Sequence, residues 1–228
     1  MTHLKSLAAP KSWPIKRKER IWTAKAIPGA HSSQIAMPLV VVLRDVLRVV
    51  ENKKEAKYVI NEGLVKVNNR KVKDVKLPVG LFDVISVAKT NKYYRISLNK
   101  KHKLFCIEID KKEANIVPLR IRRKRLINKG IIQLNFTNGW NLNVKEKNYS
   151  LRDTVVFDLS SNKITDHLPL KEGNMVFISG GKHAGSFALI EKVEGGVTLK
   201  EGKKTWKGTK KYIFVIGKKA PIIKLTEK

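Results

Sequence analysis

An apolar stripe with helical spacing follows Pro38. Leucine and valine side chains recur at intervals of three and four residues from Leu39 to Val50, which is the period of one buried face of an α-helix. Arg44 and Arg48 lie four residues apart on another face of this helix. The pattern therefore predicts a helix that begins at Pro38 and turns its two arginines away from the core.

A second helix and a hairpin are expected next. Asn52 and Glu55 have the spacing of a capping box at the start of a helix, and Gly63 supplies its end. A turn at Asn68-Asn69 separates the short apolar runs that follow. The sequence thus predicts a compact helix–helix–hairpin domain over residues 37–88. Its expected strands are 64–67, a short strand through Val72, and 83–87.

From residue 89 onward the apolar period is mostly two, which is typical of strands. We expect a β-rich central domain over 89–170 and a small β-barrel with a tail over 171–228. The runs with a period of two in these segments are 94–98, 104–106, 107–109, 131–136, 142–144 and 155–157, followed by strands expected at 175–178, 187–190, 196–199 and 212–216.

Residues 1–36 show neither period. Prolines interrupt this basic segment, which also contains Trp13 and Trp22. We expect it to be extended in isolation and to become ordered only against a partner, so that its removal leaves the rest of the chain folded. Each tryptophan ring can stack on an RNA base or pack locally, and local packing is favoured for each taken alone.

The charge of the chain identifies a class of partner. The sequence has 48 Lys and Arg against 19 Asp and Glu, a net charge of +29, and the excess is spread over all the segments above. A positive field along a whole chain suits a long polyanion, because each neutralised phosphate releases condensed counterions. A solvated basic surface is the alternative reading.

The residue content also indicates the cellular compartment and argues against a membrane-spanning segment. The single cysteine, Cys106, excludes an intramolecular disulfide and favours a reducing compartment. The longest aliphatic run, Leu39–Leu43, is much shorter than a membrane span. We therefore expect a soluble, intracellular protein with no membrane partner.

Motifs for catalysis are missing from the sequence. The five histidines are scattered, with no pair at metal-ligand spacing. Gly180-Gly181 is followed by neither a Walker lysine-serine pair nor a predicted helix. The aspartate that a pseudouridine synthase would need has no counterpart, since Arg44-Asp45-Val46 lies inside the predicted first helix, and the glycine-rich loop of a methyltransferase is missing. We expect no enzymatic activity, cofactor, metal or small-molecule substrate.

Two basic segments are candidates for direct contact with RNA. Residues 120–125 carry the densest positive cluster of the chain; a solvated turn is the alternative, but repulsion among neighbouring cations favours a phosphate clamp. Gly181 and Gly185 would let the Lys182-His183 loop approach an RNA backbone closely. We expect both segments to contact RNA through backbone shape rather than base sequence, because double-helical RNA hides its base edges in a deep major groove.

Two short stretches resemble known RNA-associated motifs. Residues 43–74 resemble the alpha-L RNA-binding motif, in which two helices and a hairpin present basic side chains to structured RNA; Asn69 stands where that motif usually has glycine. Residues 172–191 resemble a KOW motif, with Ala188 at the position of its most typical glycine. The residues that occupy the alpha-L pattern are Arg44, Lys53, Lys54, Lys57, Gly63, Val65, Val67, Asn68 and Lys71.

The order of the motifs resembles one family along nearly the whole chain. The two motifs and several shorter segments occur in an order that resembles the e-type ribosomal protein four family of the archaeal and eukaryotic small subunit. The opening run through Trp13 is highly specific for this family. Ser6 replaces a basic residue of that pattern, and the early end of the chain favours an archaeal member. The matching segments are His3–Trp13, Pro28–His31, Pro38-Leu39, Gly80–Ile85, Asp153-Thr154, Ile164–Asp166, Gly180–Lys182 and Phe214–Lys218.

The resemblance implies an α+β, mainly β protein: an extended N-terminal arm, an alpha-L domain, a β-rich centre and a KOW-type barrel. It implies a structural constituent of the small ribosomal subunit, in the cytoplasm, whose partners are small-subunit rRNA and neighbouring ribosomal proteins. The alternative is a KOW-type transcription or translation factor that binds RNA transiently. The predicted RNA-binding residues are Lys5, Lys11, Trp13, Lys16, Arg17, Lys18, Arg20, His31, Arg44, Arg48, Lys53, Lys54, Lys57, Lys71, Arg120, Arg122, Arg123, Lys124, Arg125, Lys182 and His183.

Overall fold

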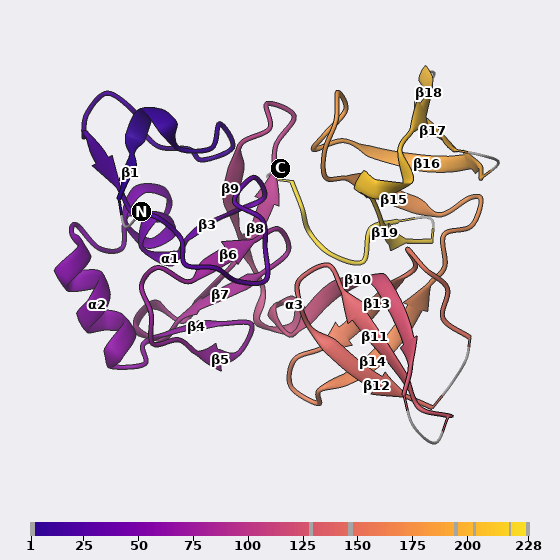
Figure 1. Cartoon of the computed structure of the whole chain (residues 1–228), viewed down its shortest axis with the longest axis horizontal. Helices are drawn as coiled ribbons and strands as arrows, with labels where there is room; N and C mark the ends of the chain where they lie inside the picture. Colours follow the sequence, from indigo (N-terminus) through magenta and orange to yellow (C-terminus); the bar gives the residue numbers. More distant parts are fainter. Residues whose placement is uncertain are drawn as a thin grey trace. The chain divides into compact units, whose positions relative to one another are not determined.

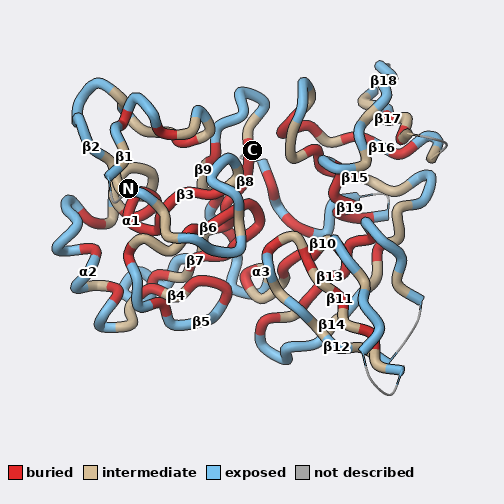
Figure 2. The backbone as a smooth tube through the Cα atoms, viewed as in Figure 1, coloured by how far each residue is buried: buried red, intermediate tan, exposed pale blue. Residues whose placement is uncertain are grey.

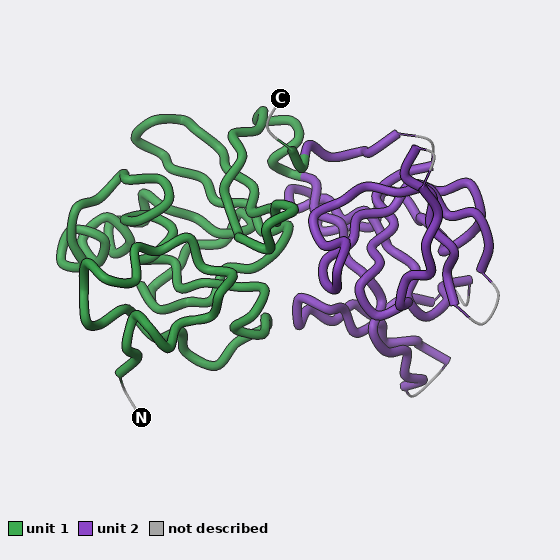
Figure 3. The backbone as a smooth tube through the Cα atoms, turned by 90° about the horizontal axis from the view of Figure 1, so that it is seen from above, with its two compact units in different colours: residues 1–115, 225–228 green, residues 116–224 purple. Residues whose placement is uncertain are grey.

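The chain forms two compact units (Figure 3). Unit 1 comprises residues 1–115 with 225–228, and unit 2 comprises residues 116–224. The domain boundaries expected at 88/89 and 170/171 do not fall on this division. The computed structural model describes residues 3–127, 130–145, 148–193, 196–202, 204–218 and 220–226.

Unit 1 contains a five-stranded antiparallel sheet of order β5-β4-β7-β8-β9 (Figure 1). β8 and β9, expected in a central domain, therefore continue the sheet of the helix–helix–hairpin region. The bounds are β4 (Val65–Val67), β5 (Arg70–Lys71), β7 (Val84–Val87), β8 (Lys92–Leu98) and β9 (Leu104–Ile109). Two-stranded pairs join β1 (Leu4–Lys5) to β2 (Trp22–Thr23) and β3 (Ala36–Pro38) to β6 (Pro78–Gly80).

The first helix is shorter than its apolar pattern predicts. α1 (Leu39–Val41) continues into one π-helical segment, η2 (Val42–Val46), and Arg48 then adopts a φ of 54°. Residues 39–43 are all buried, so this part of the chain is surrounded by the core and is not buried along one face only. Consecutive β-branched valines lower the helical propensity of such a run, which explains why the helix does not reach Val50.

The second helix and the hairpin turn agree with the sequence. α2 (Lys53–Asn61) begins after Asn52, whose side-chain oxygen accepts a hydrogen bond from the Glu55 amide at 3.0 Å. Gly63 ends the helical turn with a φ of +71°. Asn68 and Asn69 both have positive φ, 49° and 61°, as a two-residue turn of type I′ requires. Asparagine tolerates this conformation, so glycine is not needed at residue 69.

The N-terminal segment is folded onto unit 1, contrary to the expectation that it is extended. η1 (Ser6–Ala8) follows β1, and the Arg17 guanidinium donates hydrogen bonds to the carbonyls of residues 6, 7, 9 and 10. Trp13 is 2 % exposed, and its indole Nε1 donates to the Ala36 carbonyl at 2.7 Å. A buried aromatic ring and an arginine with several donors thus order a segment that has almost no regular structure.

Unit 2 contains two five-stranded antiparallel sheets, of order β12-β11-β10-β13-β14 and β18-β17-β16-β15-β19 (Figure 1). The first is formed by β10 (Ile116–Leu126), β11 (Ile132–Phe136), β12 (Asn141–Val144), β13 (Thr154–Asp158) and β14 (Lys163–Leu168). The second is formed by β15 (Met175–Ile178), β16 (Phe187–Lys192), β17 (Val197–Glu201), β18 (Lys204–Gly208) and β19 (Ile213–Gly217). Short helical turns are η3 (Ala88–Thr90) and α3 (Lys111–Ala114) in unit 1 and η5 (Lys210–Tyr212) in unit 2.

Most strands of unit 2 lie where the period of two placed them, with β10, β14 and β18 as additions. The buried residues run along the strands and the exposed ones concentrate in turns and edges (Figure 2). The apolar side chains of the second sheet pack into one core, in which Val176, Ala188, Val197 and Val215 are all buried. Fully apolar cores of this kind position the polar residues of each strand on the outside.

Candidate RNA-binding surfaces

A cleft in unit 1 brings together basic residues from two distant segments. Its volume is about 320 Å³. The N-terminal segment contributes Lys16 and Arg20, η2 contributes Arg44, and the chain just after η2 contributes Arg48. These four were predicted RNA-binding residues, and the fold gathers them around one hollow.

Trp22 lies in the same cleft and was not among the predicted site residues. Its side chain is 52 % exposed, whereas Trp13, which was predicted to bind RNA, is 2 % exposed. Because the Trp13 side chain is buried, neither face of its indole is open to a base. Composition alone does not show which tryptophan is exposed. Arg20, two residues before Trp22, is a local signal that favours Trp22 as the RNA contact.

The ion pairs in the cleft leave its cations available to an anion. Arg44 contacts Asp45 at 2.7 Å and Lys16 contacts Glu19 at 2.5 Å. The hydrogen bonds that Arg44 donates to the Asp45 carboxylate are the main reason that the pKa of Arg44 is raised, so this side chain stays charged. Such partly exposed pairs contribute about 0–1 kcal/mol, and an RNA phosphate can therefore replace them.

A second group of exposed cations lies on α2. Lys53, Lys54 and Lys57 occupy the first part of the helix and are exposed. The positive end of the helix dipole disfavours cations there, so these lysines do not stabilise the helix. Their positions suit an external polyanion. Lys5, Lys11, Lys18 and Lys71 are also exposed in unit 1.

His31 is a structural residue and not a surface contact, which corrects its prediction as an RNA ligand. Its imidazole Nε2 lies 3.0 Å from the Asp83 carboxylate, and both side chains are about 5–6 % exposed. The Gly80 amide also donates to Asp83, at 2.8 Å. Burial opposes a charged His31, but the attraction and the hydrogen bond of Asp83 outweigh it and raise the pKa.

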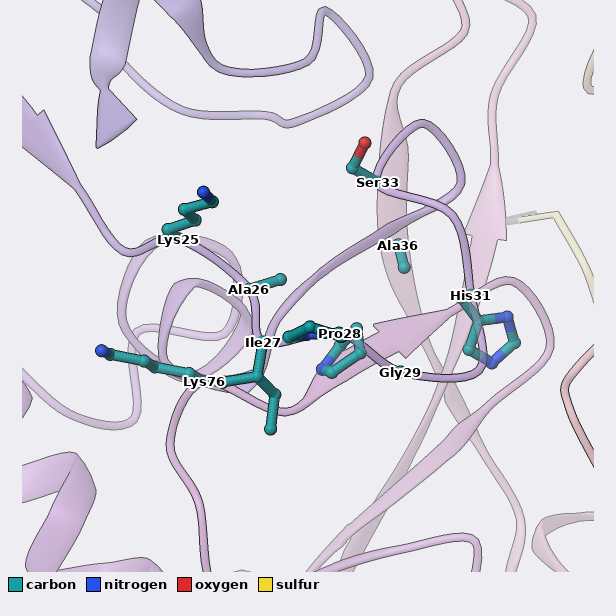
Figure 4. A pocket seen from close by; sticks show the side chains of 10 residues that line it. Lys25, Ala26, Ile27, Pro28, Gly29, His31, Ser33, Ala36 and Lys76 are labelled. Carbon is teal, nitrogen blue, oxygen red and sulfur yellow. The ribbon is translucent and has the colours of Figure 1, made fainter. Parts of the chain in front are cut away.

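A second cavity of unit 1, of about 620 Å³, borders His31 (Figure 4). Lys76 lies at one end of this cavity and His31 at the other, with Pro28 and Gly29 between them (Figure 4). A Cβ on Gly80 would come within 2.4 Å of the His31 ring, which explains the glycine at residue 80. Lys25 and Lys76 also line this cavity, and neither was in the predicted site.

The arginine cluster of residues 120–125 divides into structural and exposed members. Arg120 donates to the carbonyls of Lys211 and Ile213, and its guanidinium lies 4.3 Å from the centre of the Phe214 ring. Burial, with repulsion from Arg152 and Arg122, lowers the pKa of Arg120 to about 10. These internal contacts make Arg120 a link within unit 2 and argue against the phosphate clamp that was predicted for it.

The other members of that cluster lie on β10. Lys124 donates to the Tyr149 carbonyl at 2.9 Å and is half-buried. Arg122, Arg123 and Arg125 are exposed. The cluster was predicted as a phosphate clamp, with a solvated turn as the alternative. It lies on β10, the central strand of its sheet, and the residues of β11 beside it also determine what it can bind.

The predicted glycine-containing loop presents an aromatic pair as well as a cation. Gly181 and Gly185 have φ values of 84° and 78°, and Lys182 between them is exposed. The His183 ring stacks on Trp206 of β18, with ring centres 4.3 Å apart and planes inclined by 15°. Trp206 was missed by the sequence analysis because β18 itself was not expected.

Metal and membrane sites were also sought. Within the described ranges of the chain, no group of three or more His, Cys, Asp or Glu side chains could hold a metal ion. No helix among those residues has the length and apolar content needed to cross a membrane.

Family models match three consecutive parts of the chain between residues 2 and 164. The RS4NT (NUC023) domain matches residues 2–34, the S4 domain matches residues 37–85, and ribosomal family S4e matches residues 90–164.

Individual relatives extend the similarity to the full length. The small ribosomal subunit protein eS4 of Methanocaldococcus jannaschii is 37 % identical, covering 98 % of this chain and 97 % of its own length. That of Nanoarchaeum equitans is 42 % identical over 84 % of this chain and 82 % of the relative. The crystal structure of the 30S ribosomal protein S4e from Thermoplasma acidophilum is similar with a TM-score of 0.69 and 26 % identity, covering 80 % of this chain and 95 % of that one.

Proposed function

The chain belongs to ribosomal family S4e, and on this premise we propose that it is a structural constituent of the small ribosomal subunit that binds rRNA and supports subunit assembly and translation. Its partners in this proposal are small-subunit rRNA and the neighbouring ribosomal proteins. The role is architectural, with no catalytic step.

The cleft that gathers Lys16, Arg20, Arg44 and Arg48 around the exposed Trp22 carries the proposal. Cations bind the phosphate backbone and fix its position, and an exposed indole can stack on an unpaired base. A hollow with both features suits structured RNA better than it suits a protein surface.

Finer features of the fold belong to the same proposal. We propose that the sheet of β15–β19 is a KOW-type barrel, supported by its shared apolar core and by the loop at Lys182. The buried Ala188 at the typical glycine position packs in that core. In this proposal, the loop residues Lys182 and His183 and the exposed arginines of β10 provide further rRNA contacts.

Binding to a small-subunit rRNA transcript at increasing salt tests the role of the cleft. The variant Arg20→Gln with Arg48→Gln removes two exposed cations, and the slope of log K against log salt should fall by roughly two units. Lys163→Gln with Lys171→Gln removes two exposed charges outside the candidate surfaces and serves as the control. Equal slopes for the wild type and the cleft variant would contradict an RNA contact in the cleft.

A further inference from the structure

One outward face of the first sheet of unit 2 carries two rows of amide and guanidinium side chains. The register places Arg123 opposite Asn135 and Asn135 opposite Asn141. The next row places Arg125 opposite Gln133 and Gln133 opposite Asn143. Directly paired residues of antiparallel strands lie on one face of a sheet. We call the set Arg123, Arg125, Gln133, Asn135, Asn141 and Asn143 the amide–arginine face.

Burial confirms that this face points outward. Between the two rows, Lys124, Leu134 and Leu142 form the alternate row, and Leu134 is 0 % exposed. Both arginines, Asn141 and Asn143 are exposed, whereas the two central amides are half-buried. The alternate side of these three strands therefore faces the core, and the amide–arginine face is open to a ligand.

The residue types on this face are not explained by the stability of the sheet. Asparagine is disfavoured in strands, yet β11 and β12 carry three asparagines in adjacent positions. Asn135 Nδ2 donates to Asn141 Oδ1 at 2.6 Å, which fixes both side chains and leaves each amide with further donor or acceptor capacity. None of the six residues is acidic, so the face attracts anionic ligands.

Resting on the proposed function, we propose that the amide–arginine face binds the bases of unpaired rRNA nucleotides. An Asn or Gln amide can pair with two atoms on an adenine edge, and an arginine can do so with guanine. Neutral amides add little attraction for a phosphate, so they would be unnecessary for contact by backbone shape alone. This differs from the shape-only recognition expected for residues 120–125.

Unpaired nucleotides fit the dimensions of the face. Residues two apart on a strand are separated by roughly 7 Å, which places one row under each of two neighbouring splayed bases. Sequence-specific proteins usually recognise RNA at such loops and bulges, where base edges are accessible. The arginine at the end of each row can hold the adjoining phosphate.

The full chain can be tested with two RNA probes that differ only in their bases. One is an oligoadenylate of about ten nucleotides, and the other is an abasic ribose-phosphate oligomer of the same length. The variant Asn141→Thr with Asn143→Thr keeps the charge and suits a strand. It should reduce the preference for oligoadenylate about tenfold while the salt slope stays unchanged, because no cation is removed. Asn61→Thr makes the same exchange at an exposed residue of α2 and should leave the preference unchanged.

Side-chain amide resonances of the wild-type chain give a second readout that needs no substitution. The NH₂ signals of Gln133, Asn135, Asn141 and Asn143 should shift with oligoadenylate and not with the abasic oligomer. An unchanged base preference in the double variant, or amide signals that do not respond, would overturn this inference and leave the face to a protein neighbour. If the wild type binds both probes equally and salt-sensitively, only this inference fails; if it binds neither probe nor rRNA, the proposed function fails as well.

Discussion

Trp13 and Trp22 are nine residues apart in the sequence and have opposite environments. Replacing the buried Trp13 by alanine should cost about 3–5 kcal/mol of unfolding free energy, because it leaves a cavity in unit 1. Trp22→Ala should change stability by about 0.5 kcal/mol or less and weaken rRNA binding by about 1–3 kcal/mol, the contribution of one base stack. Urea unfolding and filter binding measure the two effects. Equal stability losses in the two variants would contradict this assignment.

The His31–Asp83 pair makes stability depend on pH. The pKa of His31 is raised above 6.5 in the folded state, so the folded protein holds a proton that the unfolded chain releases. The stabilisation is therefore complete below pH 6.5 and is lost as the pH rises through the higher folded pKa.

His31→Gln is the matched variant, because glutamine can still donate to Asp83 but does not titrate. The difference in unfolding free energy between wild type and variant should shrink as the pH rises from about 5 to 9. Urea unfolding across this range provides the measurement. A difference that is constant or grows with pH would mean that His31 is not protonated in the folded protein.

At the scale of elements, the N-terminal segment is part of the core of unit 1. Deleting residues 1–36 removes Trp13 and leaves the buried Asp83 carboxylate without its cation. Loss of a buried ion-pair partner alone costs about 3–5 kcal/mol, so the truncated chain should melt at a markedly lower temperature than the wild type. Circular dichroism during heating measures this. An unchanged melting temperature would support the earlier expectation that the segment is independent of the fold.

Local signals predicted the elements whose structure depends on few residues. The cap at Asn52, the turn at Asn68-Asn69 and most strands follow from side chains within a few positions. The N-terminal segment could not be predicted in this way, because its order comes from Trp13 and Arg17 contacting distant backbone carbonyls. Most of the predicted RNA-binding lysines are exposed, and their RNA contacts stay predictions. Trp13, His31 and Arg120 have internal partners that composition does not reveal.

At the scale of the whole molecule, the mainly β character was predictable and the grouping of strands was not. A period of two identifies a strand but not the sheet it joins. β8 and β9 therefore resembled a separate domain, although β8 pairs with β7 of unit 1. The sequence likewise did not show that the register places Asn135 beside Arg123 and Gln133 beside Arg125.

The distribution of exposed cations over both units distinguishes a resident subunit protein from a transient factor. Many simultaneous contacts with one RNA give slow release even when salt weakens each contact. A factor that binds through one small surface lacks this protection. The chain should therefore remain bound to small subunits under conditions that remove loosely associated proteins.

Sedimentation of small subunits that carry a tagged copy of the chain, before and after a high-salt wash, tests the structural role most directly. We predict that the tagged chain stays in the small-subunit fraction after the wash, in the same proportion to rRNA as before. Release of most of the chain into the supernatant, with the subunits otherwise intact, would contradict a structural role and favour a transient KOW-type factor.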